Sequence, residues 1–326
     1  MTFQALSIKP DGTRTLQSMA MGTMLSTKGA NADVCTFGDT SPNVVGKIYR
    51  DAFRKRFSAN PQLIERIIIL SRQSHELRKA LPFCGWPDRL LLAGQAKTSA
   101  DFAAQFTGFT MDRFPATTSL MELIGVRRAR LRLTPRDSVN IAIMLAEQLN
   151  KLHQHPLHFV FGDLSPNNVL VSGDFARVLF IDADAFQFST TVKGRIYTFA
   201  NDGTTPSYTS PYAIARTEAS QLPKEHDLFV LAILIFQILM ADRGFLKCHP
   251  FSSGTVEENE RIKARQFPYG DPTRYPVSAA ARKAYESLPS ELREAFTDVF
   301  MHHRVLTADA WIALLSKHRR CLHGLK

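Results

Sequence analysis

The sequence predicts an α+β fold, with a β-rich N-terminal part followed by a larger and mainly helical part. Residues 1–50 are short apolar segments interrupted by Gly, Pro, Asn and Asp, which is typical of strands joined by turns. Residues 134–152 and 225–240 instead have the length and apolar pattern of helices. The 326 residues are 44% hydrophobic, which is enough for a large core in one bilobal domain or in two ordinary domains.

Composition argues against several classes of protein. Residues 1–12 lack the apolar core of a signal peptide, and the longest apolar run, 228–240, is too short to span a bilayer and contains Gln237. The four cysteines lack metal-ligand spacing, so reduced thiols in a cytoplasmic protein are expected. A net charge of +10 would attract acidic partners, but no nucleic-acid motif accompanies it, so solvated basic helix faces are the preferred interpretation.

One charged side chain is unusual among the predicted N-terminal strands. Lys47 lies in the short apolar strand 44–49, where it either reaches a partner or protects a sheet edge from aggregation. A helix with a broad apolar face is expected over 61–81. Residues 83–94 and 108–114 are expected to contain two further strands.

The C-terminal part is predicted to be built from helices. Residues 134–152 form an amphipathic helix with Thr134 as its N-cap and Pro135 in its first turn. The segment 225–240 is apolar all round, and such a helix belongs in the centre of a large core. Two more amphipathic helices are expected within 288–315.

A hairpin in the middle of the chain carries the strongest chemical signal. Two apolar strands, 169–171 and 178–181, are joined by a turn and flanked by Asp163, Asn168 and Asp182. Because a short hairpin folds back on itself, these three side chains can converge at one of its ends. Two carboxylates beside an Asn suit phosphoryl transfer from a magnesium nucleotide. Asp182 and Asn168 would supply hard oxygen ligands to the metal, and Asp163 would deprotonate the attacking hydroxyl.

This pattern resembles the catalytic and metal-binding loops of protein kinases, H-R-D-L-x-x-x-x-N and D-F-G. From about residue 20 to 315 the chain resembles a bacterial Ser/Thr protein kinase of the eukaryotic-like superfamily. The group concerned is often fused to helix-hairpin-helix segments, or encoded in tellurite-resistance clusters beside a metal-dependent phosphatase and a von Willebrand-type protein. The matching stretches are GANADVC, VVGKIY, GWP, GFTM, GDLSPNNVLV, FIDADAFQ, GTTPSYTSPY, EHDLFVLAILIFQILM and HPF.

The resemblance implies a bilobal fold, with an N-lobe over 1–111 and a C-lobe over 112–326. Lys47 would bind the α- and β-phosphates of ATP. Glu65, which follows it by 18 positions (65 − 47), would hold this lysine in place, with Glu76 as the competing candidate. A glycine-rich loop, the adenine pocket and the hinge would supply further ATP contacts through Gly29, Ala30, Asn31, Ala32, Val34, Met111, Asp112 and Phe114.

The implied reaction is transfer of the γ-phosphoryl group of ATP to Ser or Thr hydroxyls of proteins, including the chain itself. ATP and Mg²⁺ would be the cofactors, with Mn²⁺ as an alternative metal. A protein substrate is the implied partner, and a cognate phosphatase or a von Willebrand-type protein is a further candidate. Residues 203–212 would form the activation and substrate-binding segment. Asp227, at the start of the apolar helix, would bind the catalytic-loop backbone.

Several positions depart from the kinase pattern. Gly162 replaces the arginine of H-R-D, which reads a phosphate on the activation segment, so activation by loop phosphorylation is less favoured. Ser165 replaces a lysine that helps to neutralise the γ-phosphate. Asp184 replaces the glycine of D-F-G and adds a negative charge near the metal. Tyr212 replaces the glutamate of A-P-E, and Ala30 stands where a glycine is usual.

Two alternatives remain open. The form G-D-L-x-P-x-N followed by I-D also resembles aminoglycoside and choline kinases, which are small-molecule phosphotransferases. Those enzymes lack the GTTPSYTSPY segment joined to an apolar helix. The alanine-containing loop and the lost glutamate would instead suit a pseudokinase that acts as a binding module. Retention of Lys47, Asp163, Asn168 and Asp182 favours an active protein kinase.

Overall fold

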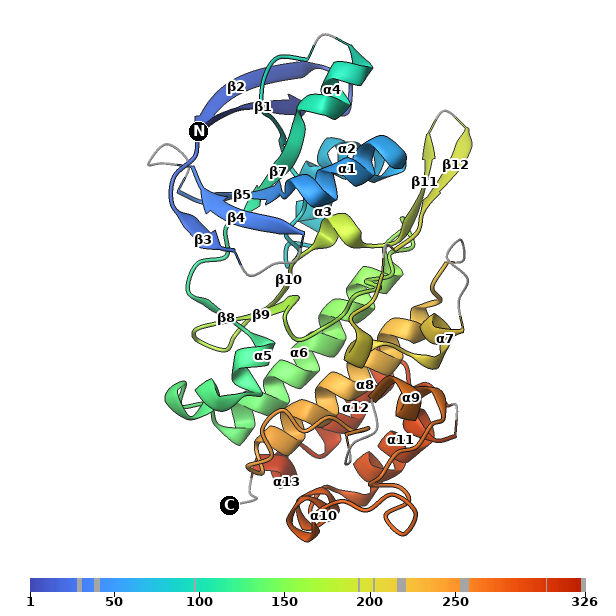
Figure 1. Cartoon of the computed structure of the whole chain (residues 1–326). Coiled ribbons are helices and arrows are strands. Elements are labelled where there is room, and N and C mark those ends of the chain that lie inside the picture. Colours follow the sequence, from blue (N-terminus) through green and yellow to red (C-terminus); the bar gives the residue numbers. More distant parts are fainter. Residues whose placement is uncertain are drawn as a thin grey trace. The chain divides into compact units, whose positions relative to one another are not determined.

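The computed structural model contains both helices and strands (Figure 1). The structure describes residues 1–27, 31–37, 42–96, 98–192, 194–201, 203–215, 221–252, 258–302 and 304–323. The chain forms two compact units. Unit 1 consists of Met1–Pro115 with Ile181–Asp184, and unit 2 consists of Ala116–Phe180 with Ala185–Lys326. The predicted α+β class is confirmed.

Unit 1 is built on an antiparallel sheet, which in the described residues has seven strands in the order β2-β1-β6-β7-β5-β4-β3. The strands are β1 (Thr2–Ile8), β2 (Arg14–Ala20), β3 (Met24–Ser26), β4 (Ala32–Thr36), β5 (Val44–Tyr49), β6 (Leu90–Leu92) and β7 (Phe106–Asp112). The predicted strand at 44–49 is present as β5, which pairs with β4 on one side and β7 on the other. Lys47 therefore lies in an interior strand, which excludes the interpretation of its charge as protection of a sheet edge.

Alternation along β5 decides which face of the sheet carries Lys47. The helices of unit 1 are α1 (Asp51–Ala59), α2 (Gln62–Arg72), α3 (Ser74–Ala80) and α4 (Ser99–Gln105). Val45, Lys47 and Tyr49 share one face, because successive residues of a strand point to opposite sides. Val45 and Tyr49 belong to an apolar cluster that includes Phe57 of α1 and Ile64 of α2. Lys47 is thus carried on the face of the sheet that α1 and α2 cover.

The helical stretch predicted over 61–81 is present as α2 and α3, with a break at Gln73. The backbone of Gln73 leaves the helical conformation, with ψ near 2°, and α3 starts immediately after it. Ser74 donates a hydrogen bond of 3.0 Å to the Asp88 carboxylate, and Ser71 donates to the Asp88 carbonyl. Hydroxyl groups that bind groups outside the helix in this way compete with helical continuity.

Unit 2 contains two small sheets and, in its described residues, the longest helices of the chain. Its strands are β8 (Thr117–Ser119), β9 (Val169–Ser172), β10 (Val178–Phe180), β11 (Phe188–Val192) and β12 (Arg195–Phe199), arranged as β10-β9-β8 and β11-β12. Its α-helices are α5 (Leu120–Leu123), α6 (Pro135–Gln154), α7 (Pro211–Ile214), α8 (Lys224–Ala241), α9 (Glu258–Lys263), α10 (Ala279–Glu286), α11 (Ser290–Phe300), α12 (Ala308–Lys317) and α13 (Arg319–His323). The hairpin predicted at 169–181 is present as β9 and β10. The β11–β12 hairpin was not predicted.

The two long helices of unit 2 confirm their sequence signals. Helix α6 begins at Pro135, and the Thr134 hydroxyl accepts a hydrogen bond from the Asp137 backbone while the Asp137 carboxylate accepts one from the Thr134 backbone. Helix α8 is buried nearly all round, as expected for an apolar segment that lacks a polar face. It packs beside α6 and α11, as Figure 1 shows. Its Phe236 meets the Phe296 ring of α11 edge to face, with centroids 5.3 Å apart.

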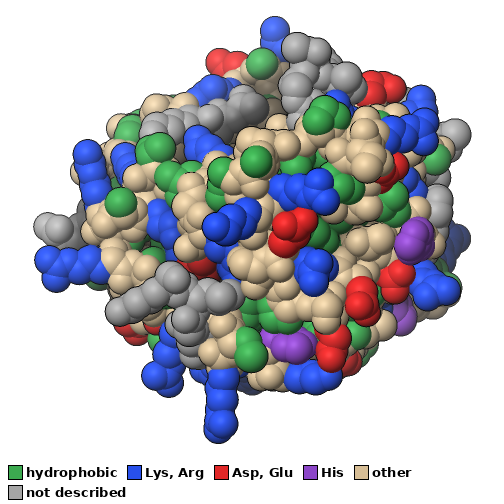
Figure 2. Space-filling model, turned by 90° about the horizontal axis from the view of Figure 1, so that it is seen from below, with side chains coloured by type: hydrophobic (Ala, Val, Ile, Leu, Met, Phe, Trp, Pro, Cys, Tyr) green, Lys and Arg blue, Asp and Glu red, His purple; other side chains and the backbone are tan. Residues whose placement is uncertain are grey.

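Charges of both signs are mixed on the face of the molecule that Figure 2 presents. Figure 2 shows Lys and Arg side chains spread among acidic and polar ones over the face that it presents. In the basic stretch that begins at Arg127, Arg128 is largely buried. Its guanidinium donates to Ser138 and pairs with Asp242, so it is structural. No helix among the described residues combines the length and the apolar character needed to cross a membrane.

A buried histidine links the stability of unit 2 to pH. His249 is 3% exposed, its Nε2 lies 2.8 Å from the Ser207 carbonyl oxygen, and its ring contacts Tyr208 edge to face. Burial lowers the pKa of His249 to about 4, because the charged imidazole would lose its hydration. Between pH 6.5 and 4, His249 is therefore protonated in the unfolded chain but stays neutral in the folded chain.

We predict that the free energy of unfolding falls as the pH decreases from 6.5 towards 4, by up to about 3 kcal/mol from this group. Urea unfolding of wild type and His249→Gln at pH 7 and at pH 4.5 checks this, because glutamine can still donate to Ser207 but does not titrate. The variant should lose less stability on acidification than wild type. His302→Gln, at an exposed position, is the matched control, and equal losses in wild type and His249→Gln would contradict the assignment.

Candidate active site

Lys47 is the centre of a charged cluster inside unit 1. Its side chain is largely buried, and its Nζ lies 3.1 Å from Asp182 Oδ1 and 2.8 Å and 3.0 Å from the two oxygens of Asp184. Burial alone would lower the pKa of Lys47, but the two carboxylates outweigh it and raise the pKa well above its ordinary value. The lysine is therefore held as an ammonium in a place where water is scarce.

Asp184 is the more deeply enclosed of the two carboxylates. It is 5% exposed and accepts a hydrogen bond of 2.6 Å from the Tyr49 hydroxyl. Burial would raise the pKa of Asp184, but Lys47, Tyr49 and the positive charge of Arg66 together lower it. Burial and the adjacent carboxylate raise the pKa of Tyr49, so its hydroxyl stays protonated as a donor. Asp184 is thus an ionised carboxylate held by at least two donors.

Asp182 differs from Asp184 in exposure and in backbone conformation. Its side chain is 41% exposed, and its Oδ1 binds Lys47. Its φ of 63° is in the left-handed region, which non-glycine residues rarely adopt and which often occurs at functional sites. Within the described residues, Oδ2 of Asp182 has no hydrogen-bond partner. That oxygen is available to a metal ion, as the sequence-based role of Asp182 requires.

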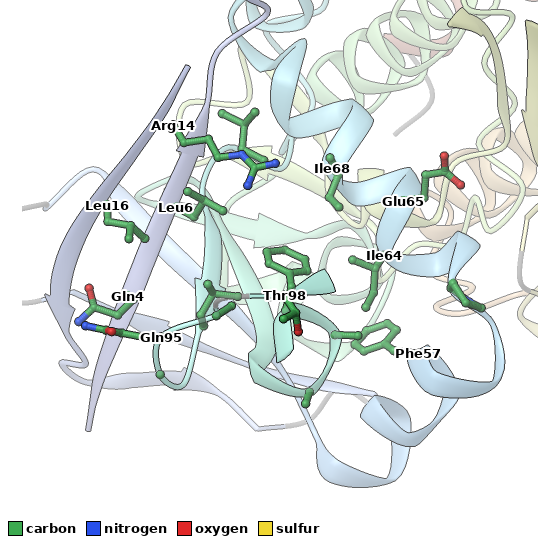
Figure 3. Close-up of a pocket in the computed structure, with 18 of the residues that line it drawn as sticks. Gln4, Leu6, Arg14, Leu16, Phe57, Ile64, Glu65, Ile68, Gln95 and Thr98 are labelled. Carbon is green, nitrogen blue, oxygen red and sulfur yellow. The ribbon is translucent and has the colours of Figure 1, made fainter. Parts of the chain in front are cut away.

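The expected ion pair between Lys47 and Glu65 is not among the contacts of the described residues. Glu65 lies on the exposed side of α2 and borders a cavity of about 1020 Å³, whose lining includes Leu6, Phe57 and Ile64. Figure 3 shows the Glu65 side chain directed away from the strands that Ile64 faces. Because adjacent helix residues point about 100° apart, the next residue faces inward instead, and that residue is Arg66, which is buried. A cation therefore stands where the sequence predicted an anion.

Glu76, the competing candidate for the Lys47 partner, also lies elsewhere. It is on α3, with its carboxylate 3.2 Å from Lys79 and 3.9 Å from His75 on the surface. The carboxylates that contact Lys47 in the described residues are instead those of Asp182 and Asp184. The pattern D-A-D signalled an extra charge, but its distance to Lys47 could not be obtained from the sequence.

The predicted glycine-rich loop is described only in part. Gly29 and Ala30 lie outside the described residues. Ala32 and Val34 belong to β4 rather than to a loop, and Val34 is paired directly with Lys47 of β5. Asn31, which precedes β4, accepts a hydrogen bond of 2.9 Å from the Arg50 backbone. The prediction of a loop over 29–35 is therefore wrong for residues 32–35, because regular pairing with β5 extends the strand to Ala32.

The predicted adenine-pocket and hinge residues lie at the end of β7 or just beyond it. Met111 is 7% exposed and pairs with Val45. The Asp112 carboxylate lies 3.0 Å from Arg78 Nε, and burial raises its pKa despite that arginine. Phe114 follows the strand. These positions agree with the expected strand, while an adenine-binding role for them stays a prediction.

Asp163 and Asn168 are brought together in unit 2, as the hairpin pattern predicted. Asn168 Nδ2 donates to the Asp163 carbonyl at 2.9 Å and to the Asp163 carboxylate at 3.1 Å. Thr205 donates to the same carboxylate through its backbone and its hydroxyl, both at 2.7 Å. Val169 pairs with Phe180, so Asn168 stands at the end of the hairpin where the chain leaves β10. Asn168 uses its amide nitrogen here, which leaves its Oδ1 without a partner among the described residues.

The backbone before Asp163 is fixed by a buried carboxylate. Asp227 of α8 is 0% exposed and accepts hydrogen bonds from the Phe161 and Gly162 amides, at 2.6 and 2.9 Å. His153 Nε2 lies 2.8 Å from the same carboxylate. Burial would raise the pKa of Asp227, but the hydrogen bonds and the neighbouring histidines lower it. The expected binding of Asp227 to this loop is confirmed.

Another buried histidine, His226, which the sequence pattern does not indicate, joins the same loop to the segment 203–212. His226 Nε2 lies 2.8 Å from the Gly162 carbonyl, and its Nδ1 lies 2.9 Å from the Ser210 hydroxyl. The signal was present in the adjacent letters H and D of the EHD motif and in the serine of SPY. It was missed because a histidine inside an apolar helix gives no indication of its partner.

Gly162 has a structural explanation. Its φ is +78°, and a Cβ at this position would lie 2.4 Å from Asn201 Nδ2. A side chain here would therefore be strained and would displace Asn201. The departure from the arginine of the kinase motif is built into the packing of this loop.

The residues predicted to hold magnesium retain suitable donor atoms. Among the described residues no group of three or more His, Cys, Asp and Glu side chains could hold a metal ion. The predicted pair needs no such group, because Mg²⁺ is usually held by one or two carboxylates together with substrate phosphates and water. Asn168 and Asp182 each keep one oxygen without a hydrogen-bond partner in the described residues, and each oxygen is of a type that Mg²⁺ accepts as a ligand.

Comparison with known proteins adds no assignment. No protein-family model matches the chain, and a search of curated proteins finds no significant match.

We predict that Asp227→Ala lowers the free energy of unfolding by about 3–5 kcal/mol, because two backbone amides and His153 lose a buried charged acceptor. Urea denaturation measures the change. Glu225→Ala removes an exposed carboxylate from the same helix turn and should change stability by less than about 0.5 kcal/mol. Similar, small effects of both substitutions would show that Asp227 does not hold the loop.

Proposed function

We propose that the chain is a Ser/Thr protein kinase that uses ATP and Mg²⁺, with unit 1 as the N-lobe and unit 2 as the C-lobe of a bilobal kinase fold. The observation that carries the proposal is the buried ammonium of Lys47, paired with Asp182, a residue 135 positions away. Burying the Lys47 ammonium and the Asp184 carboxylate costs desolvation energy and is seldom the most stable solution. A cluster of charged groups with perturbed pKa values is a candidate functional site.

Lys47 supplies a fixed positive charge for the phosphates of ATP. The carboxylates raise its pKa, so it stays charged at every physiological pH. The surrounding low dielectric strengthens its attraction for an incoming polyphosphate. Magnesium, when bound, would neutralise charge on the β- and γ-phosphates, and the free oxygens of Asn168 and Asp182 are the ligands that this chain offers.

Asp163 is the proposed base for the hydroxyl that attacks the γ-phosphate. Its carboxylate is oriented by Asn168 and by both donors of Thr205, so it cannot rotate freely. Orientation of a base within hydrogen-bond reach of the acceptor hydroxyl matters as much as its pKa. Asp227 and His226 fix the backbone from which this carboxylate projects.

The acceptor is proposed to be a protein hydroxyl rather than a small molecule. Segment 203–212 contacts the base through Thr205 and the loop through Ser210, so it is part of the catalytic neighbourhood of unit 2. A segment in this place can present an acceptor peptide. A cognate phosphatase or a von Willebrand-type protein remains a candidate partner by resemblance alone.

We predict that wild-type protein transfers label from γ-labelled ATP to protein hydroxyls in the presence of Mg²⁺. Asp163→Asn and Asp182→Ala should each reduce the rate by about 100-fold or more, because they remove the base and a metal ligand. Asp174→Asn, in the exposed turn of the β9–β10 hairpin, is the matched control and should leave the rate unchanged. Generic protein acceptors and aminoglycosides are tested in parallel.

The outcomes separate the competing functions. Label on Ser or Thr that is lost in both variants supports the proposal. Label on aminoglycoside alone would identify a small-molecule phosphotransferase. Binding of ATP without transfer to any acceptor, including the chain itself and a proteome-derived peptide mixture, would identify a pseudokinase.

A further inference from the structure

Asp184 stands where the kinase pattern has a glycine, yet it is tied more closely to Lys47 than any other described carboxylate. Both of its oxygens lie within 3.0 Å of the Lys47 ammonium, whereas Asp182 offers one oxygen at 3.1 Å. Asp184 is also the more buried of the two, because its side chain is 7% exposed and that of Asp182 is 41% exposed. A buried two-oxygen contact restrains the position of an ammonium more strongly than a single exposed one.

The surroundings of Asp184 are arranged to hold it in this place. The Tyr49 hydroxyl donates to its Oδ2, and Tyr49 lies two residues after Lys47 on the same face of β5. The tyrosine ring is itself packed at 5.1 Å from both Phe53 and Phe57 of α1. Lys47 and Tyr49, which both lie on β5, therefore donate to the same carboxylate, that of Asp184. Aromatic packing fixes the position of the Tyr49 ring.

Charge balance explains why Glu65 is not required. The cluster contains two cations, Lys47 and Arg66, and two carboxylates, Asp182 and Asp184. A third carboxylate would give this largely enclosed cluster a net negative charge, which is unfavourable. Helix α2 thus contributes Arg66 to the cluster, and Glu65 stays outside on the exposed side of the helix.

We propose that Asp184 is the residue that positions Lys47 for ATP, in place of a helix glutamate. This inference rests on the proposed function. Because Asp184 takes up most of the contact with Lys47, Asp182 keeps its second oxygen for the metal. The two aspartates of the D-A-D sequence then have separate roles: Asp182 is a magnesium ligand and Asp184 positions Lys47. Asp184 acts through Lys47 and does not itself touch the nucleotide.

The first test measures the pKa of the Lys47 side chain and does not require enzymatic activity. Full-length protein with ¹³C-labelled lysine is titrated by NMR, and the Lys47 signal is assigned from its loss in Lys47→Arg. Asp184→Asn removes the charge at nearly constant volume and should lower the pKa of Lys47 relative to wild type. Glu65→Gln should leave that pKa unchanged. A Lys47 pKa that responds to Glu65→Gln and not to Asp184→Asn would overturn the proposal.

The second test separates positioning from a merely structural role. Initial rates are measured against ATP at saturating Mg²⁺, and against Mg²⁺ at fixed ATP. Asp184→Asn should lower kcat/KM for ATP by about tenfold or more, because a charge-assisted contact to Lys47 is lost. The Mg²⁺ concentration for half-maximal rate should stay as in wild type, whereas it should rise in Asp182→Asn.

Conservative variants keep the test valid if Asp184→Asn folds poorly. Tyr49→Phe removes one donor to Asp184 without changing charge, and it should lower kcat/KM for ATP in the same direction but by less. Glu65→Gln should match wild type. A raised Mg²⁺ requirement in Asp184→Asn would make Asp184 a metal ligand, and equal loss in Glu65→Gln would restore the glutamate to the site; either result overturns the inference. Absence of transfer by wild type would refute the proposed function, while the NMR titration would still decide the contact between Asp184 and Lys47.

Discussion

Compensation of one buried positive charge is the constraint on which unit 1 depends. An ammonium enclosed on the helix-covered face of a sheet is tolerated only when carboxylates surround it, because the lost hydration must be replaced. Asp182 and Asp184 supply that replacement, and the Tyr49 hydroxyl donates a further hydrogen bond to Asp184. The short segment Ile181–Asp184 therefore belongs to the compact unit that contains β5, although the rest of its neighbourhood in sequence belongs to unit 2.

Unit 2 contains a buried negative charge, which also needs partners to replace its lost hydration. Asp227 is a fully buried carboxylate, and the amides of the loop before Asp163 together with His153 surround it. Because that acceptor sits on α8, the most apolar helix of the chain, its position is set by packing on every side. The loop that carries the proposed base thus takes its rigidity from the core. Gly162 permits this geometry, because glycine adopts the positive φ without strain and its lack of a Cβ leaves room for Asn201.

Sequence patterns predicted the elements whose physical cause is local. Short apolar runs bounded by turn residues indicated β5, β9 and β10, the Thr134 cap indicated the start of α6, and uniform apolarity indicated the buried α8. Sequence patterns failed where a side chain's partner lies far away in the sequence. Glu65 and Arg66 are neighbours on one helix, and only the tertiary arrangement shows that Arg66 faces the charged cluster while Asp184 supplies the carboxylate. The small residues near position 30 predict a loop that includes 32–35, because such a pattern does not reveal that these residues pair with β5.

Magnesium-dependent binding of ATP tests the central claim most directly, because it precedes any choice of acceptor. Calorimetric titration of the full chain with ATP should show binding to one site in the presence of Mg²⁺. Lys47→Ala should abolish it, while Lys79→Ala, at an exposed lysine of α3, should not. Failure of wild type to bind ATP, or equal binding by wild type and Lys47→Ala, would contradict the assignment of this buried ammonium to nucleotide phosphates.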